Sequence, residues 1–314
     1  MIVTVTPNPS LDRTMLIDTW TRGGIHRPTS VRLTPGGKGV NVARAVAAAD
    51  QRVIAVMPSG GPEGARLAEL LAPEAVAVVE VPIARATRSN VIIQAADGTT
   101  TQFNEPGPEL TDEELTALEA RAAELAGRAR WVVSCGSLPD GCPDTLHARL
   151  VDRCHQAGTR AAVDASGPAL ARACRAGPDL ITPNLAELAD LTDRRLDHLG
   201  EVVDAADGVR RAGVAAVLVS LGQHGALLVQ ASAAWHATSP VTPVSSAVGA
   251  GDALLAGFLI AGGDGISALR TAVAYGAAAA GLSGGRVPTP RDLRPDEVSV
   301  CEANESLRLT EAAV

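Results

Sequence analysis

Short, nearly continuous apolar runs alternate with longer helical patterns along this chain, and that alternation constrains its fold more than any other feature. The runs are rich in β-branched residues, which is typical of strands buried on both faces of a parallel sheet. Strands are therefore expected at 2–6, 53–57, 76–81, 131–135, 160–164, 179–182 and 215–221. Helical patterns lie between them, at 38–50, 62–72, 111–126, 143–157, 200–213, 249–262 and 265–284. Together they predict an α/β fold, doubly wound, with a mostly parallel sheet flanked by helices.

Two segments, 10–34 and 84–104, interrupt the alternation because they lack a helical period. The second reads as a hairpin with Asp97-Gly98 at its turn. We expect the two segments to pair as a small β-sheet beside an α/β core formed by 1–9, 35–83 and 105–314. The polar tail after about residue 297 is expected to fray.

Composition narrows the classes of function that need to be considered. The formal net charge of −8 argues against a nucleic-acid-binding protein. No apolar run is long enough for a transmembrane helix, and the first residues lack the pattern of a signal peptide. The five cysteines include no CxxC pair, and the six histidines have no zinc-type spacing. These features predict a reduced, cytoplasmic protein that acts on neither membranes nor nucleic acids.

A first glycine-rich turn, "PGGKGVN" (35–41), leads into an alanine-rich helical pattern. Gly36 and Gly37 allow the backbone to turn and to approach a ligand closely. Lys38 and Asn41 then stand in the first helical turn, where free N–H groups and the helix dipole favour an anion. A glycine-rich loop with a solvated lysine is the alternative reading of this stretch.

A second such turn is "VGAGDALL" (248–255), in which residues 249–251 can direct successive N–H groups at one point. Asp252 would then stand in the first turn of a helix, either as a catalytic carboxylate or as ordinary helix-end electrostatics. Neither turn fits a Walker P-loop or the three-glycine Rossmann fingerprint. Two anion cradles at strand-to-helix turns would suit a reaction between two phosphate-bearing molecules.

With these residues identified, the chain resembles the phosphofructokinase B family of ribokinase-like sugar kinases. "PGGKGVNVAR" and "VGAGDALLAGFL" are similar to the two family signatures. Further motifs resemble the branch of 1-phosphofructokinase and tagatose-6-phosphate kinase, namely "TPNPSLD", "TRSN", "NEPGPEL", "SCGSLPDGCP", "DASG" and "TPNLAEL". The resemblance implies an α/β core with a β-sheet lid formed by 10–34 and 84–104, and a homodimer joined through that lid. It also implies transfer of the γ-phosphate of ATP, with Mg2+, to a hydroxyl of a sugar phosphate, with fructose 1-phosphate as the expected substrate.

The resemblance assigns roles to three groups of residues. Asp252 matches the base that takes the proton of the attacking hydroxyl. The backbone of Gly249, Ala250 and Gly251 matches the anion hole around the transferring phosphoryl group. The residues that match the family's substrate-binding positions are Asp12, Gly36, Gly37, Lys38, Asn41, Arg88, Asn90 and Ser137. Of these, Lys38, Arg88 and Ser137 are expected to bind the phosphate that the sugar already carries. The residues that match the family's nucleotide-binding positions are Asn184, Glu187, Ser220, Gly222, Gly225 and Ser283. Glu187 is expected to bind Mg2+ through a water molecule.

Several alternatives stay open at the level of the sequence. Taken alone, Asp12 could cap a turn, Glu187 could be a helix-surface residue and Arg88 could be a solvated residue of the lid. Ser246 and Ala247 depart from the family pattern, which leaves a monovalent-cation site undecided. Tagatose 6-phosphate and fructose 6-phosphate are alternative substrates. An NAD-dependent oxidoreductase and a non-catalytic sugar-phosphate-binding regulator are remote alternative functions.

Overall fold

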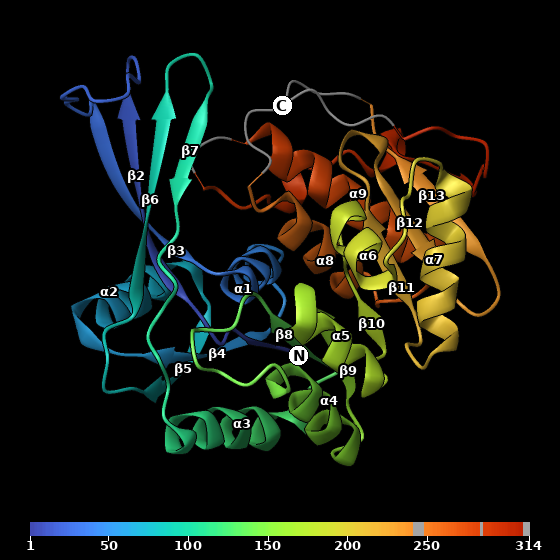
Figure 1. Cartoon of the computed structure of the whole chain (residues 1–314), viewed down its shortest axis with the longest axis horizontal. Helices are drawn as coiled ribbons and strands as arrows, with labels where there is room; N and C mark the ends of the chain where they lie inside the picture. The colour runs from blue at the N-terminus through green and yellow to red at the C-terminus, as the bar shows by residue number, and fades with distance from the viewer. Residues whose placement is uncertain (241–247, 283–284, 310–314) are drawn as a thin grey trace.

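The structure is a computed structural model that describes residues 1–240, 248–282 and 285–309, and a ten-stranded sheet runs through its centre (Figure 1). Seven strands are parallel: β5 (Ala77–Pro82), β4 (Val53–Ser59), β1 (Ile2–Val5), β8 (Trp131–Cys135), β9 (Arg160–Asp164), β10 (Leu180–Ile181) and β11 (Val217–Ser220). Three antiparallel strands complete one edge: β12 (Ala226–Val229), β13 (Ala234–Thr238) and β14 (Ser299–Glu302). The predicted mostly parallel sheet is therefore confirmed.

Helices cover both faces of this sheet, because successive strand residues point to opposite sides. Ile2 and Trp131 pack with one hydrophobic cluster, whereas their chain neighbours Val3 and Val132 pack with another. The first cluster includes residues of α1 (Lys38–Ala48), α2 (Gly61–Leu71), α8 (Ala250–Ile260) and α9 (Gly265–Gly281). The second includes residues of α3 (Asp112–Ala126), α4 (Leu146–Gln156), α5 (Gly167–Arg175), α6 (Leu185–Thr192) and α7 (Leu199–Arg211). This arrangement is the doubly wound fold that the strand and helix patterns predict.

A separate four-stranded sheet stands beside the core (Figure 1). Its order is β3 (Ser30–Gly36), β2 (Ser10–Ile17), β6 (Arg88–Ala95) and β7 (Thr100–Phe103). The strands β6 and β7 form the predicted hairpin, in which Asp97 accepts a hydrogen bond from the backbone N–H of Thr99 at 2.8 Å. Because the end of β3 leads into α1, the small sheet is joined to the first glycine-rich turn.

The structure differs from the sequence-based expectations at the tail and in two helices. The tail is expected to fray after about residue 297, but its residues Ser299–Glu302 form β14, which pairs with β13 along the sheet edge. The helices α5 and α6 were not expected. Both are short, α5 begins with a Gly-Pro pair and α6 follows a Pro-Asn pair, and both pairs resemble loop signals. Ser246, Ala247 and Ser283 lie outside the described residues. Within the described ranges, no helix combines the length and apolar character needed to cross a membrane.

Candidate active site

The two glycine-rich turns meet at the starts of α1 and α8. Gly37 precedes α1 with a φ of 108°, and Gly249 precedes α8 with a φ of 79°, a backbone region that favours glycine. No side chain among the described residues caps either helix start, so the first N–H groups are left for a ligand. A Cβ atom on Gly249 or Gly251 would meet no atom of the described residues within 4 Å.

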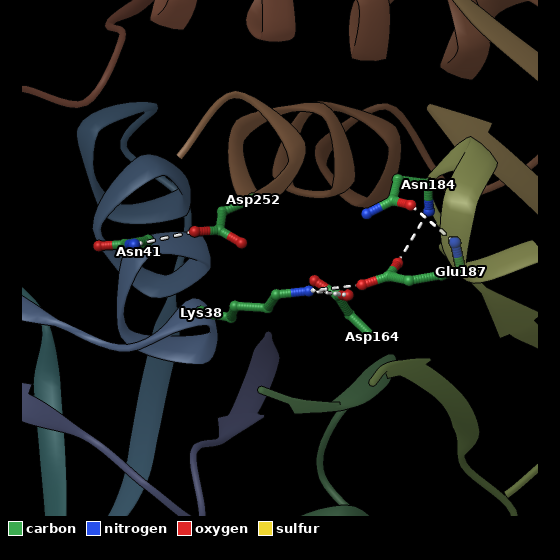
Figure 2. A network of polar contacts seen from close by, with 6 residues as sticks. All are labelled: Lys38, Asn41, Asp164, Asn184, Glu187 and Asp252. Carbon is green, nitrogen blue, oxygen red and sulfur yellow. Dashed lines mark hydrogen bonds and ion pairs between the residues drawn. The ribbon is translucent and has the colours of Figure 1, made fainter. Parts of the chain in front are cut away.

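Asp252 lies where these two helix starts come together. Its Oδ2 atom accepts a hydrogen bond from Nδ2 of Asn41 at 2.8 Å, across 211 residues of sequence (Figure 2). The residue is only 7% exposed. Burial, followed by the nearby negative charge of Asp164, raises the pKa of Asp252 to about 7, against the opposing effects of Asn41 and Lys38. A carboxylate with that pKa can exchange a proton with a substrate near neutral pH.

Lys38, on the same helix as Asn41, contacts two carboxylates (Figure 2). Its Nζ lies 2.8 Å from Oδ1 of Asp164 and 3.8 Å from Oε1 of Glu187. Burial opposes the charge on Lys38, but Asp164 and Glu187 outweigh it and raise the pKa of the ammonium group. The prediction that Lys38 holds the substrate phosphate stays a prediction. Its ion pair with Glu187 also brings it next to the residues expected to bind the nucleotide.

Asp164 is a site residue that the sequence reasoning missed, although its motif "DASG" was noted. It is the last residue of β9, its side chain is 6% exposed, and burial raises its pKa while Lys38 opposes that shift. The usable signal was positional, since polar residues at the carboxyl ends of parallel strands commonly face a ligand.

Asn184 and Glu187 form a capping box at the start of α6. The Asn184 side chain accepts a hydrogen bond from the Glu187 N–H, and the Glu187 carboxylate accepts one from the Asn184 N–H, both at 2.8 Å (Figure 2). The spacing N-x-x-E therefore has a local structural reason. It also leaves Oε1 of Glu187 facing Lys38. Asn184 pairs with Ser220 in a parallel β-bridge, which brings the end of β11 to the same place.

The small sheet contributes a second polar cluster around Asp12. Its Oδ1 atom accepts hydrogen bonds from Ser10 Oγ at 2.7 Å and from Asn90 Nδ2 at 2.8 Å. Burial raises the pKa of Asp12, and these hydrogen bonds oppose the shift. Gly36 is required here, since a Cβ atom at that position would lie 2.3 Å from the Asp12 carboxylate.

Arg88 and Ser137 lie next to this cluster. Arg88 donates hydrogen bonds to the backbone carbonyls of Glu105, at 2.7 Å, and Asn8, at 3.0 Å. The side chain of Asn8 in turn donates to Ser137 Oγ at 3.3 Å. Arg88 forms no ion pair within the described residues, but the carboxylates of Asp12 and Glu105 are near enough to favour its positive charge.

One cleft of about 490 Å³ joins most of these groups. Twelve of the expected site residues line it, namely Gly37, Lys38, Asn41, Arg88, Asn90, Ser137, Asn184, Glu187, Ser220, Gly249, Gly251 and Asp252. Asp12 lines an adjoining cavity that shares Asn41 and Gly249 with the cleft. Four expected residues, Gly36, Gly222, Gly225 and Ala250, do not line the cleft, and Ser283 lies outside the described residues.

Known proteins are similar to this chain in sequence and in fold. Residues 6–292 match the family described as "pfkB family carbohydrate kinase". The chain belongs to this family. It is 36% identical to a 1-phosphofructokinase of Rhodobacter capsulatus, over 93% of this chain and 94% of the relative. It is 37% identical to the ATP-dependent 6-phosphofructokinase isozyme 2 of Escherichia coli, over 81% of this chain and 83% of the relative.

Solved structures of relatives agree with that assignment. The crystal structure of phosphofructokinase-2 from Escherichia coli in complex with substrates and products has a TM-score of 0.88, with 35% identity over 93% of this chain and 96% of the other. The ribokinase of Arabidopsis thaliana, at 22% identity over 93% of this chain and 96% of the other, supports the fold alone with a TM-score of 0.75. The chain is thus a ribokinase-like sugar-phosphate kinase, for which ATP is the phosphate donor, and not an NAD-dependent oxidoreductase.

Proposed function

We propose that this protein is an ATP-dependent 1-phosphofructokinase, which converts fructose 1-phosphate and ATP into fructose 1,6-bisphosphate and ADP. The observation that carries the proposal is the position of Asp252. This buried carboxylate stands at an uncapped helix start and lines one cleft together with Arg88 and Ser137, which we name the sugar-phosphate wall, and with Asn184 and Glu187, which we name the nucleotide wall. Several relatives named 1-phosphofructokinase, including that of Rhodobacter capsulatus, support the choice of sugar.

In this proposal the two walls of the cleft bind different phosphates. Arg88 and Ser137 bind the phosphate already on the sugar, for which a planar guanidinium and a hydroxyl are suitable donors. Asp12 and Asn90 hold sugar hydroxyls. Asp252 accepts the proton of the attacking hydroxyl, and the N–H groups at the start of α8 stabilise the charge that develops on the transferring phosphoryl group.

The carboxylates of this site fit a magnesium ion whose other ligands come mainly from the phosphate groups of ATP. Among the described residues no cluster of three acidic, histidine or cysteine side chains could hold a metal by itself. Mg2+ in kinases commonly uses one or two carboxylates together with phosphate oxygens and water. Glu187 and Asp164 lie on the proposed nucleotide wall, and we assign Mg2+ binding to Glu187, in part through water. When bound, the ion would neutralise charge on the phosphates.

A panel of phosphosugars tests the substrate assignment. With saturating ATP and Mg2+, kcat/KM is expected to be highest for fructose 1-phosphate among fructose 1-phosphate, fructose 6-phosphate, tagatose 6-phosphate and free fructose. The similarity to 6-phosphofructokinase isozyme 2 makes fructose 6-phosphate the second candidate. A preference for an unphosphorylated sugar would contradict the proposal, and binding without turnover would support a non-catalytic regulator.

The pH dependence of kcat/KM tests the role of Asp252 as base, because this quantity reports the pKa of the free enzyme. Only the ionised carboxylate can accept a proton, so kcat/KM is expected to fall as the pH drops through about 7. The hydrogen bond from Asn41 lowers the pKa of Asp252, so Asn41→Ala should move this acidic limb to higher pH, by about half to one unit. Thr159→Ala, which removes a buried hydrogen bond at the opposite end of β9, should leave the limb in place. A limb that stays fixed or moves to lower pH in Asn41→Ala would contradict this assignment.

We further propose that the protein forms a homodimer through the outer face of the small sheet. The strand register puts Met15, Val31 and Ile93 side by side on that face, with Val91 and Phe103 paired next to them. Val31 is 52% exposed and Phe103 is 53% exposed, which is unusual for an apolar sheet face. The family resemblance supports a dimer, and one Escherichia coli relative, phosphofructokinase-2, has a tetrameric inhibited form.

The dimer proposal predicts that Phe103→Asp separates the protomers, because it inserts a charge into an apolar contact. Light scattering after size-exclusion chromatography should give the mass of a dimer for the wild type and of a monomer for the variant. Ile266→Asp is the matched control, since Ile266 is also an exposed apolar residue, 40% exposed, but lies on α9. A monomeric wild type, or dissociation by both substitutions, would refute the assigned surface.

A further inference from the structure

Asn8 connects three segments that form the sugar-phosphate wall of the cleft. It follows β1, lines the cleft, and is only 3% exposed. Its Nδ2 atom donates to the backbone carbonyl of Pro106 at 2.9 Å and to Ser137 Oγ at 3.3 Å. Its own backbone carbonyl accepts the hydrogen bond from Arg88 Nη2 at 3.0 Å. One residue therefore contacts both groups to which we assign the phosphate.

The surroundings of Asn8 fix the orientation of its side chain. Its Oδ1 atom is buried and has no hydrogen-bond partner among the described residues, so the amide is held through its nitrogen. Gly107 has a φ of 96°, and a Cβ atom at that position would lie 2.2 Å from Oδ1 of Asn8. Only glycine leaves room for the amide at this point. Burying an amide oxygen without a partner costs free energy, so stability alone does not explain this residue.

The hydrogen bonds of Asn8 determine what Ser137 and Arg88 can offer to a ligand. Because Ser137 Oγ accepts the N–H of Asn8, the hydroxyl proton of Ser137 is left to donate to another group. Each Nη atom of Arg88 donates to a backbone carbonyl, and Nε is buried with no partner among the described residues. Both residues line the cleft, so the Ser137 hydroxyl proton and the second N–H of each Arg88 Nη atom are the donors left for an anion there.

We infer that Asn8 is a positioning residue for the phosphate group of the sugar substrate, acting through the Ser137 hydroxyl. The inference rests on the proposed function, because it assumes that Ser137 and Arg88 bind that phosphate. Asn8 itself takes no part in proton or phosphoryl transfer.

Steady-state kinetics of Asn8→Ala and Asn8→Leu test this role. The leucine variant keeps the volume of the side chain and removes its N–H donors. In both, KM for fructose 1-phosphate is expected to rise about ten-fold, the effect of one misdirected hydrogen bond to a charged group. KM for ATP should change less than about two-fold in the same preparations. Thr159→Ala, which also removes a buried hydrogen bond, should change neither KM value.

A double-mutant cycle with Ser137→Ala separates positioning from general damage. If Asn8 acts through Ser137, the loss in kcat/KM for the double variant is smaller than the product of the two single losses. Equal rises in KM for fructose 1-phosphate and in KM for ATP would overturn the inference. So would a loss in kcat/KM of the double variant that equals the product of the two single losses. The proposed function has a separate test, since it fails if the wild type prefers another sugar. The cycle is then measured with that sugar, and the same two outcomes decide the role of Asn8.

Discussion

Replacing Asp252 with asparagine is expected to lower kcat by about 10²- to 10⁴-fold, the range associated with loss of a general base. Asparagine keeps the shape of the side chain and can still accept the hydrogen bond from Asn41, but it cannot take a proton. The dissociation constant of ATP, measured by calorimetry, should change much less. Near-normal turnover in this variant would remove Asp252 from the role of base.

The same substitution is expected to stabilise the folded protein above neutral pH. The folded pKa of Asp252 is about 7, whereas an unfolded Asp titrates near about 3.9. The folded state therefore holds this proton more tightly, and its stability decreases as the pH rises from about 4 to about 7. Asp252→Asn removes that ionisation, so its gain in Tm over the wild type should be larger at pH 8 than at pH 4.5.

Asp152→Asn is the control for this pH-dependent gain, since Asp152 is an exposed residue of α4. It should show no comparable change in Tm between the two pH values. An equal or smaller gain for Asp252→Asn at pH 8 would mean that the Asp252 carboxylate is not held at a raised pKa. Loss of activity together with a gain in stability is the signature of a carboxylate retained for its chemistry.

Replacing Lys38 with methionine is expected to damage both stability and catalysis. It leaves the buried Asp164 carboxylate without its cation, which should cost about 2–3 kcal/mol in the free energy of unfolding. This figure lies below that of a fully buried pair, because the Lys38 side chain is 39% exposed and partly screened by solvent. The loss of positive charge also raises the pKa of Asp252 further, so less of the base is ionised at neutral pH.

A second substitution separates the two effects of Lys38. In Lys38→Met/Asp164→Asn the unpaired carboxylate is gone, so most of the free energy of unfolding should return in chemical denaturation. The kcat should stay low, since no cation is left between the proposed phosphate sites. KM for the sugar phosphate and for ATP should both rise, because Lys38 also faces Glu187. A double variant with near wild-type kcat would show that the ion pair serves only the fold.

The type of each element could be predicted where a local pattern is long and regular. The buried runs at 2–6 and 131–135 became β1 and β8, and the hairpin turn at Asp97-Gly98 joins β6 and β7. The helices α5 and α6 escaped prediction because they have eight or nine residues, too few to establish a period. The pairing of β14 with β13 depends on an edge that only the folded sheet provides.

By itself the sequence determined the α/β class, the two glycine-rich helix starts, the family resemblance, and the expectation that Asp252 and Lys38 belong to one site. These properties depend on residue type and short spacing, which a chain carries locally. The tertiary structure alone brought Asn41 to Asp252, Lys38 to Asp164 and Asn8 to Ser137, pairs that are separated by 211, 126 and 129 residues. Packing on the two faces of the central sheet sets those distances, and with them the burial that shifts the pKa of Asp252.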